Sequence, residues 1–438
     1  MTLRVCVDAR IHPGVSGGLE QSILGLAGGL TALTDGHEEY LFLVEEDHRD
    51  WLTPHLHGRD ELLVVSAAKR RVSRLARSLA RPVWHAVTPI VGKRTVPVPR
   101  SPGLAEGAGA NVMHFTTQRA FTTPLPSIYQ PWDLQYVHFP EFFTRRQRLV
   151  RSKWDREFCR RAAKVVVASE FGRREVVNRL GVEQEKIAVV PVGPGAATYA
   201  RPTDVEIEAT RRELGLPRSF ALYPAQTWPH KNHLRLLEAV AFLRGRGLSI
   251  PVVCCGHKNA FYPHLARRAM ELGLTDLVSF PGFVEPIQLR SLYALARAVI
   301  FPSLFEGGGM PVLEAFMARV PLACSNVTCL PEQVGDAALT FDPRDTRAIA
   351  SSLESVWTEE RLRAVLVKRG RERLTRHGWH EIARIFRAHY RQLGRVRLTP
   401  ADLDLLRGSE NGRLAPQLQP QPDSATHANR ADAVTVNR

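Results

Sequence analysis

Short apolar runs alternate with segments of helical periodicity along most of the chain, and this alternation constrains the fold more than any other feature. The chain begins with an apolar run at 3–8, a glycine-containing loop at 13–18, and a segment from Leu19 in which apolar residues recur at helical spacing. Strands that alternate with helices are typical of a parallel sheet with helices on its faces. The sequence therefore predicts a doubly wound α/β domain over residues 1–193. Its further strands are expected at 39–45, 62–66, 110–115, 164–169 and 187–191.

A second series of the same kind follows residues 193–202, where glycine and proline without periodicity predict a linker. We expect a second doubly wound domain over residues 194–395 that faces the first across a cleft and ends in an amphipathic helix at 379–395. A length of 438 residues suits two or three domains. The strands of this domain are expected at 219–224, 250–255, 278–280, 298–302 and 321–325, and its helices at 232–244, 260–272, 287–296 and 312–318.

Residues 399–438 are predicted to form a disordered tail. The segment 416–422 reads PQLQPQP, and the residues after it are rich in Ala and Asn. Such a composition offers little apolar surface from which to build a core.

The composition indicates a globular protein of the cytoplasm. Apolar residues make up 44% of the chain, and the six cysteines are scattered without a Cys-x-x-Cys pair, which is unfavourable for a disulfide framework or a zinc site. The start of the chain lacks the apolar core of a signal peptide, and no run of about 18 apolar residues occurs. We therefore expect neither secretion nor a membrane span.

Positive charge is concentrated in the first half of the chain. The chain carries 59 Lys and Arg against 44 Asp and Glu, and nine basic residues but no acidic one lie between Glu61 and Glu106. If residues 69–84 form a helix, arginines and apolar side chains fall on opposite faces. Two interpretations stay open: a surface helix that packs on its own domain, and a helix that docks on an anionic membrane surface. Nucleic acid is disfavoured because no aromatic residues are interleaved with the basic ones.

The stretch 299–318 carries the strongest chemical signal. A buried strand is expected to end at Pro302, three glycines follow Glu306, and Pro311 suits the first turn of a helix. Free amides at such a helix start form an anion site. A carboxylate beside a phosphate would repel it, so Glu306 and Glu314 are better suited to accept hydrogen bonds from sugar hydroxyls. A purely structural turn is the alternative.

This stretch resembles the Glu-x7-Glu motif of the retaining glycosyltransferases of family 4, with Glu306 and Glu314 as its two acids. The resemblance covers about residues 3–395. It implies the GT-B fold, in which two Rossmann-like domains face each other and the last helix crosses back. It also implies transfer of a sugar from a nucleotide-diphosphate donor with retention of the anomeric configuration. Further segments that match the family lie at 17–18, 228–232, 281–284, 301–303, 325–326, 330–332 and 335–338, and around Trp379.

The resemblance implies roles for individual residues of this sequence. Lys231 would neutralise the donor diphosphate and Glu306 would contact the donor sugar, so these two are the catalytic candidates. Because the diphosphate leaves as an already acidic group, a lysine and helix dipoles can stabilise it, and we expect no metal ion and no cofactor. The donor-binding candidates are the glycines of two loops and the glutamate that would contact the ribose: Gly17, Gly18, Gly308, Gly309 and Glu314.

Two departures from the family pattern concern the diphosphate and the acceptor. The arginine that many members carry shortly before the lysine is missing from 224–230, so His230 or another residue would have to supply a second cation. The acceptor-side His-Asp pair of the family reads Trp132-Asp133 here, and a tryptophan cannot act as an acid or a base. Asp133 and His138 are therefore the acceptor-side candidates.

The leading hypothesis is a retaining hexosyltransferase of cell-surface polysaccharide synthesis, peripheral at the inner face of the membrane, with mannose as a candidate sugar. Its partners would be a nucleotide sugar, with GDP or UDP undecided, and a glycan or lipid-linked acceptor. A nucleotide-sugar epimerase or a phosphorylase of the same fold is one alternative. A non-catalytic nucleotide-sugar-binding protein is another, favoured by Trp132 and the missing arginine.

Overall fold

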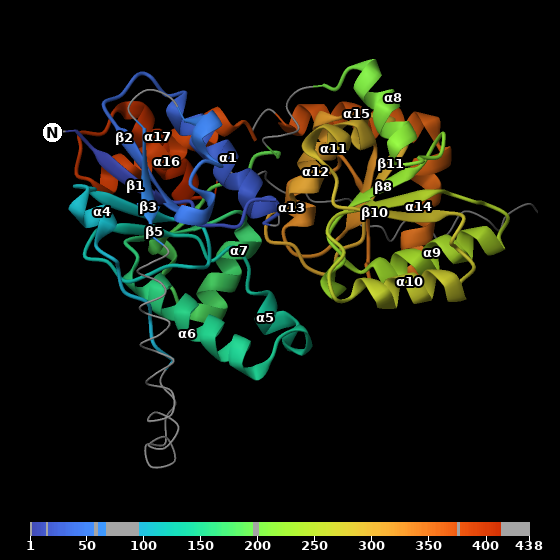
Figure 1. Cartoon of the computed structure of the whole chain (residues 1–438), viewed down its shortest axis with the longest axis horizontal. Helices are drawn as coiled ribbons and strands as arrows, with labels where there is room; N and C mark the ends of the chain where they lie inside the picture. Colours follow the sequence, from blue (N-terminus) through green and yellow to red (C-terminus); the bar gives the residue numbers. More distant parts are fainter. Residues whose placement is uncertain are drawn as a thin grey trace, which may run out of the picture.

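The computed structural model describes residues 2–14, 16–56, 60–66, 96–195, 201–374 and 377–412. Two α/β domains lie side by side, and each is built on one parallel sheet with helices packed against it (Figure 1). This arrangement confirms the predicted fold of two Rossmann-like domains. Within the described part of the chain, none of the helices combines the length and apolar composition that crossing a bilayer requires. The basic segment 69–84 lies outside the described residues.

The first sheet has seven strands in the order β3-β2-β1-β4-β5-β6-β7. Successive side chains point to opposite faces, so Val5 and Val7 belong to one core and Cys6 belongs to the other. All of these strands except the three-residue β5 were predicted from the sequence. Their bounds are Arg4–Asp8 (β1), Glu39–Glu45 (β2), Glu61–Val65 (β3), Val112–Phe115 (β4), Ser127–Tyr129 (β5), Lys164–Val167 (β6) and Ile187–Val189 (β7).

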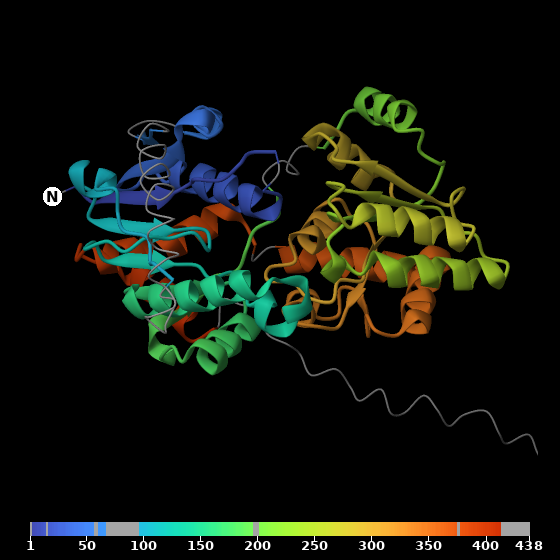
Figure 2. The same cartoon turned by 60° about the horizontal axis from the view of Figure 1, so that its bottom comes forward.

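Helices cover both faces of the first sheet (Figure 2). A capping box starts the longest of them: the Thr144 hydroxyl accepts from the amide of Gln147, and the Gln147 side chain accepts from the amide of Thr144. Ser169 caps another by accepting from the amide of Gly172 at 3.1 Å. The helices are α1 (Gly18–Thr31), α4 (Leu104–Gly107), α5 (Gln135–His138), α6 (Arg145–Arg161) and α7 (Glu170–Glu175), which continues as a π turn (Val176–Leu180).

The second sheet has six strands in the order β10-β9-β8-β11-β12-β13. Its strands are Ala221–Pro224 (β8), Val252–Cys255 (β9), Val278–Gly282 (β10), Ala298–Phe301 (β11), Leu322–Ser325 (β12) and Leu339–Phe341 (β13), and only β13 was not predicted. The helices around it are α8 (Asp204–Glu213), α9 (His233–Gly245), α10 (Tyr262–Glu271), α11 (Pro286–Leu295), α12 (Met310–Met317), α13 (Leu330–Val334), α14 (Thr346–Thr358) and α15 (Glu360–Leu374).

The last long helix, α16 (Trp379–Leu393), crosses back and packs on α1 of the first domain, as predicted (Figure 1). The indole of Trp379 lies between two glycines, Gly25 of α1 and Gly193 at the start of the linker. Its Nε1 donates to the carbonyl oxygen of Pro194 at 2.7 Å. This side chain therefore ties the last helix, the linker and the first domain together.

The prediction that residues 399–438 are disordered is wrong at its start, because Pro400–Glu410 form helix α17. A capping box between Thr399 and Asp402 begins this helix, and Pro400 occupies its first turn. The Asp402 carboxylate also forms a buried ion pair with Arg391 of α16 at 3.0 Å, and Leu406 is buried. Residues 413–438 lie outside the described part of the chain.

The packing of Trp379 against Gly25 leads to a matched pair of stability predictions. A Cβ at Gly25 would overlap the indole ring, whereas a Cβ at Gly28 of the same helix has no atom within 4 Å. Gly25→Ala should therefore destabilise the protein by about 1–3 kcal/mol through overpacking. Gly28→Ala should stabilise it by up to about 1 kcal/mol, because alanine is the better helix former.

Thermal unfolding of the two full-length variants checks this, at roughly 2–4 °C per kcal/mol for domains of this size. Equal melting temperatures for Gly25→Ala and Gly28→Ala would contradict the role assigned to the indole.

Candidate functional site

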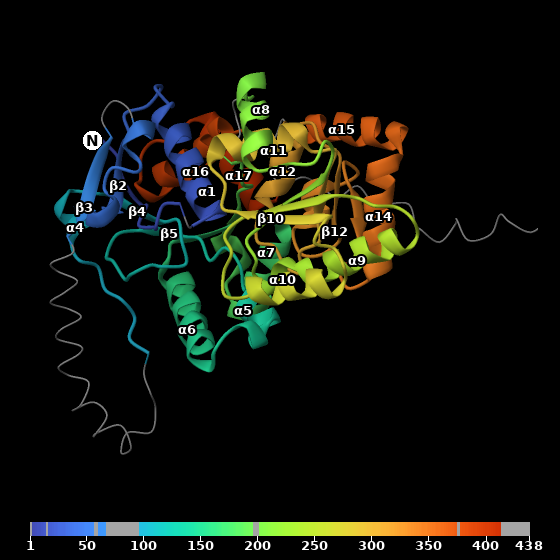
Figure 3. The same cartoon turned by 45° about the vertical axis from the view of Figure 1, so that its right-hand side comes forward.

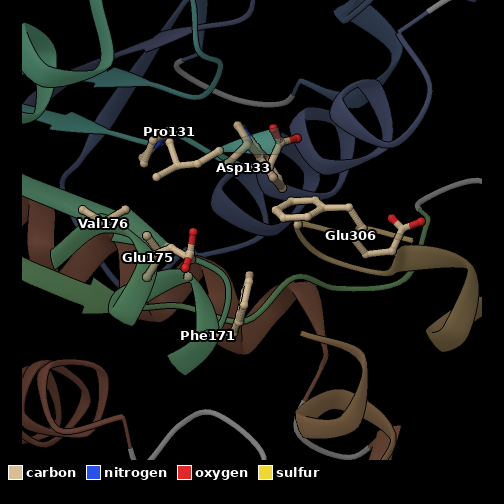
Figure 4. A pocket seen from close by; sticks show the side chains of 12 residues that line it. Pro131, Asp133, Phe171, Glu175, Val176 and Glu306 are labelled. Atoms are coloured by element: carbon tan, nitrogen blue, oxygen red, sulfur yellow. The ribbon is translucent and has the colours of Figure 1, made fainter. Parts of the chain in front are cut away.

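The two domains meet at a pocket that is lined from both sides (Figure 4). The space between its walls is about 320 Å³, part of which is open to solvent. Its first-domain wall comes from the loop after β5, which carries Asp133, and from the start and end of α7, which carry Phe171 and Glu175. Its second-domain wall is the loop after β11, with Glu306 and Gly307. The carboxyl ends of parallel strands therefore converge here, where such sheets bind ligands.

The two catalytic candidates from the sequence form an ion pair. Lys231 ends a 3₁₀ turn (Pro229–Lys231) before α9, and its Nζ lies 2.6 Å from Oε1 of Glu306. The side chains are 18% and 9% exposed, so the pair is partly shielded from water. The ammonium also lies 5.6 Å from the centroid of the Phe301 ring. A lysine with these partners is placed to receive an anion at the edge of the second sheet.

The glycines after Glu306 bring the two domains into close contact. A Cβ on Gly307 would lie 3.2 Å from the carbonyl oxygen of Trp132 and 3.3 Å from Cβ of Asp133. Gly309, the N-cap of α12, has φ 55° and ψ 38°, a left-handed conformation that glycine adopts readily. The side-chain amide of Gln333 donates to the carbonyl oxygen of Gly308 at 3.0 Å and so restrains the backbone of this loop. Gln333 was not identified from the sequence.

Glu314 is buried one turn into α12, where its carboxylate accepts from the hydroxyl of Tyr293 at 2.8 Å. Burial raises the pKa of Glu314 to about 7, and the hydrogen bond from Tyr293 opposes that rise. The carboxylate also lies against the backbone of Gly195 in the linker. Glu306 pairs with a lysine, whereas Glu314 is buried against a tyrosine hydroxyl. The two carboxylates are therefore suited to contact different parts of one ligand.

The first loop of the chain reaches across to the second domain. Gly17 has φ 55° and ψ −128°, a conformation that other residues rarely adopt, and a Cβ there would lie 3.3 Å from Nε2 of Gln226. The Nε2 of His257 donates to the carbonyl oxygen of Gly14 at 2.6 Å. Gly18 has open space where a Cβ would stand. The structure therefore brings the predicted glycines of the first loop to the edge of the second sheet.

The acceptor-side candidates differ in their surroundings. Asp133 lines the pocket, and its Oδ1 accepts from the amide of Gln135 at 3.2 Å. Burial raises the pKa of Asp133, the negative charge of Glu306 adds to the rise, and the positive charge of Lys231 opposes it. Trp132 has φ 61°, and its Nε1 donates to the carbonyl oxygen of Thr116 at 2.6 Å.

His138 does not line the pocket. Its Nε2 is hydrogen-bonded to the Glu175 carboxylate, and its ring lies 5.1 Å from that of Phe305, measured between centroids. For His230, the possible second cation, burial lowers the pKa to about 2, and the positive charge of Lys231 adds to this fall.

A contact between the domains was also missed at the sequence level. The Glu332 carboxylate of α13 accepts from the amides of Glu170 and Phe171, at 2.8 and 3.2 Å, in the first turn of α7. Burial raises the pKa of Glu332, and these two hydrogen bonds oppose that rise. Glu332 lies in a segment that matched the family, but a contact so distant in sequence leaves no local signal.

Comparisons with known proteins find a family whose model matches the second domain. Residues 206–373 match the family model described as Glycosyl transferases group 1. The O-antigen chain mannosyltransferase B of Escherichia coli is 27% identical over 249 residues, which cover 56% of this chain and 65% of that protein. The serotype-specific mannosyltransferase WbdA of Escherichia coli is 26% identical over 253 residues, which cover 55% of this chain and 31% of that protein. The chain thus spans less than two thirds of these two relatives.

Solved structures resemble the whole described architecture. Anabaena Alr3699/HepE in complex with UDP and glucose matches with a TM-score of 0.67 at 15% identity, over 89% of this chain and 100% of that one. WaaG, a glycosyltransferase involved in lipopolysaccharide biosynthesis, matches with a TM-score of 0.56 at 16% identity, over 89% of this chain and 99% of that one. At such identities these likenesses show the fold alone. The chain therefore has the GT-B fold, and the match of its second domain to the group 1 glycosyl transferases supports a glycosyltransferase.

Proposed function

We propose that this protein is a retaining glycosyltransferase that moves mannose or a related hexose from a nucleotide-diphosphate sugar to a glycan or lipid-linked acceptor. The observation that carries the proposal is the Lys231–Glu306 ion pair of 2.6 Å at a pocket between two facing α/β domains. Two relatives named as mannosyltransferases support mannose, and the one named as an O-antigen chain mannosyltransferase supports a place in cell-surface polysaccharide synthesis. We propose that the protein works at the inner face of the membrane as a peripheral enzyme.

The donor would bind mainly to the second domain. Its diphosphate would take the place of Glu306 as the partner of Lys231, because two phosphates carry more negative charge than one carboxylate. The free amides at the start of α12, around Gly308 and Gly309, would add donors for phosphate or sugar oxygens. Glu306, released from the lysine, could then accept hydrogen bonds from the sugar hydroxyls. Gly17 and Gly18 would let the first loop close over the diphosphate.

The reaction exchanges one bond at the anomeric carbon for another. The bond to the diphosphate oxygen breaks with its electron pair left on that oxygen, where Lys231 and the dipole of α12 stabilise the charge. The acceptor hydroxyl forms the new bond on the face from which the diphosphate leaves, which retains the configuration. Asp133 is the proton acceptor that the first-domain wall offers, since His138 is occupied by Glu175.

A non-catalytic nucleotide-sugar-binding protein is the second candidate, favoured by Trp132 in a position that offers no proton transfer. A nucleotide-sugar epimerase or a phosphorylase of the same fold is a third. Product analysis separates the three: a transferase joins the sugar to an acceptor, an epimerase changes the free donor, and a phosphorylase needs inorganic phosphate.

Removing either member of the ion pair should abolish transfer while leaving the fold intact. We expect Glu306→Gln and Lys231→Met each to reduce transfer at least about 100-fold, as is typical when a group that stabilises transition-state charge is lost. A nucleotide at 100 times its dissociation constant stabilises by about 2.7 kcal/mol, so thermal shifts with GDP, UDP, ADP and dTDP also identify the donor base. Lys231→Met should lose that shift.

Lys368→Met, at an exposed lysine of α15, is the matched control, and the double variant Lys231→Met/Glu306→Gln removes both charges together. Transfer that survives Glu306→Gln would contradict the assignment. No thermal shift with any nucleotide would move the conclusion to a protein that binds no nucleotide sugar.

Transfer should not require a divalent metal ion, because Lys231 and the start of α12 provide the positive charge that the leaving diphosphate needs. We expect the same rate with excess EDTA as with added magnesium, measured on the purified protein. Activity that disappears with EDTA and returns with magnesium or manganese would contradict this part of the proposal.

The buried Glu314 should make stability depend on pH. Its pKa of about 7 in the folded state lies above the ordinary value of 4.5, so the folded protein holds this proton more tightly than the unfolded chain does. The contribution of Glu314 to stability is therefore largest below about pH 4.5 and is lost as the pH rises to about 7, by roughly 3 kcal/mol in total. A ribose that donates hydrogen bonds to the carboxylate would reduce this loss.

Thermal melting of Glu314→Gln and the wild type across this pH range measures the difference. The melting temperature of the wild type should fall relative to that of Glu314→Gln as the pH rises through this range, and Tyr293→Phe should extend that fall to higher pH because it removes an opposing hydrogen bond. Parallel curves for the wild type and Glu314→Gln would show that the carboxylate does not ionise in a buried site.

A further inference from the structure

The solvent-facing side of α6 carries a dense row of cations. The inner side of this helix packs on the first sheet through Phe158 and Cys159, and Asp155 accepts there from the hydroxyl of Tyr129 at 2.8 Å. At about 100° per residue the outward positions span a narrow sector. We call these six exposed residues the α6 stripe: Arg145, Arg146, Leu149, Lys153, Arg156 and Arg160.

The charges of the α6 stripe are largely uncompensated. Among the described residues, Arg160 is the one member of the stripe with an ion pair, to Glu157 at 2.9 Å. Arg156 instead donates to the carbonyl oxygen of Arg179 at 2.9 Å. Five cations with one carboxylate partner form a surface that attracts an extended anion rather than one that stabilises the fold.

Apolar side chains are exposed within and beside the stripe. Leu149 lies in its middle and is 66% exposed, and Phe142, just before α6, is 36% exposed. The ring of Phe142 stacks on Phe139, with centroids 5.4 Å apart, and Phe139 meets Phe305 of the second domain edge-on at 6.2 Å. Phe305 precedes Glu306, so a row of three aromatic rings leads from the pocket to the start of the stripe.

We propose that the α6 stripe docks this protein on an anionic lipid bilayer. A basic helix with exposed apolar side chains can lie in the bilayer interface, where the cations meet lipid phosphates and the apolar groups leave water. In Figures 1 and 3, α6 lies at the lower edge of the first domain, and α5 lies beside it. Resting on the proposed function, this places the pocket beside a bilayer that holds a lipid-linked acceptor.

The apolar residues favour lipid over nucleic acid as the partner. Single-stranded nucleic acids use free aromatic faces to stack bases, but the Phe142 ring already stacks on Phe139. An exposed leucine among the cations contributes nothing to phosphate contacts along a nucleic acid, whereas it gains free energy when it enters a bilayer interface.

Vesicle co-sedimentation of the full-length protein, without donor or acceptor, tests the proposal independently of any transfer activity. The variant Arg145→Gln/Arg146→Gln/Lys153→Gln removes three cations of the stripe that have no ion pair among the described residues. Because each cation near an anionic surface strengthens binding about fivefold, we expect roughly a 100-fold loss on vesicles of phosphatidylcholine with phosphatidylglycerol. Binding to phosphatidylcholine alone should be weak for every variant.

The matched control removes three exposed cations from α15 of the second domain, in the variant Arg361→Gln/Lys368→Gln/Arg371→Gln. It has the same net charge as the stripe variant, leaves residues 69–84 unchanged, and should retain nearly all binding. Leu149→Gln should weaken vesicle binding several-fold and leave binding to a single-stranded RNA oligonucleotide unchanged.

Three results would overturn the proposal. One is undiminished vesicle binding by the stripe variant, and another is an equal loss in the α15 control, which would reduce the effect to net charge. The third is wild-type binding to the RNA oligonucleotide but not to anionic vesicles, which would identify the stripe as a nucleic-acid surface. Melting temperatures close to that of the wild type confirm that each variant folds.

Discussion

The indole of Trp379 lies where the first domain, the linker and the last helix meet, and the cleft depends on this junction. Gly25 and Gly193 leave room for the ring, and its Nε1 donates to Pro194. Helix α16 runs along α1, so the described part of the chain leaves the second domain and returns to the first. A chain that crosses once would leave the two sheets joined by one linker, whereas a second crossing restrains their relative orientation. This restraint therefore sets the distance between the loops of the two domains that form the pocket.

Within the pocket, the charges are balanced by one another before any ligand arrives. Lys231 neutralises Glu306, and the negative charge of Glu306 contributes to the raised pKa of the Asp133 carboxyl on the opposite domain. Each carboxylate raises the free energy of the other when both are charged. An anionic donor that recruits the lysine would expose Glu306 to that repulsion, unless sugar hydroxyls donate hydrogen bonds to it. The site therefore favours a ligand that carries both an anion and hydroxyl groups over a bare phosphate.

The sequence predicts much of the sheets but little of the contacts between domains. Buried parallel strands appear as apolar runs such as Lys164–Val167, and their positions were correct. The strands Ser127–Tyr129 and Leu339–Phe341 were missed because each has three residues, one of them polar, whereas the equally short Ile187–Val189 lies in a longer apolar run. Helix α17 did leave a local signal, in Thr399 and Pro400 with a carboxylate three residues after the threonine, but its partner Arg391 belongs to another helix.

Trp132 shows why the acceptor side was the hardest part to predict. The residue type alone indicates only that an imidazole is absent, whereas the structure shows a left-handed backbone, an indole bonded to Thr116, and packing against the core of the second domain. A left-handed tryptophan costs on the order of 1–3 kcal/mol, and the contacts on both sides of the cleft maintain it. Burial is also the largest cause of the raised pKa of the neighbouring Asp133 carboxyl. On the proposed function, an indole in place of the family's imidazole would leave proton transfer to the neighbouring aspartate, and the raised pKa of that carboxyl suits the task.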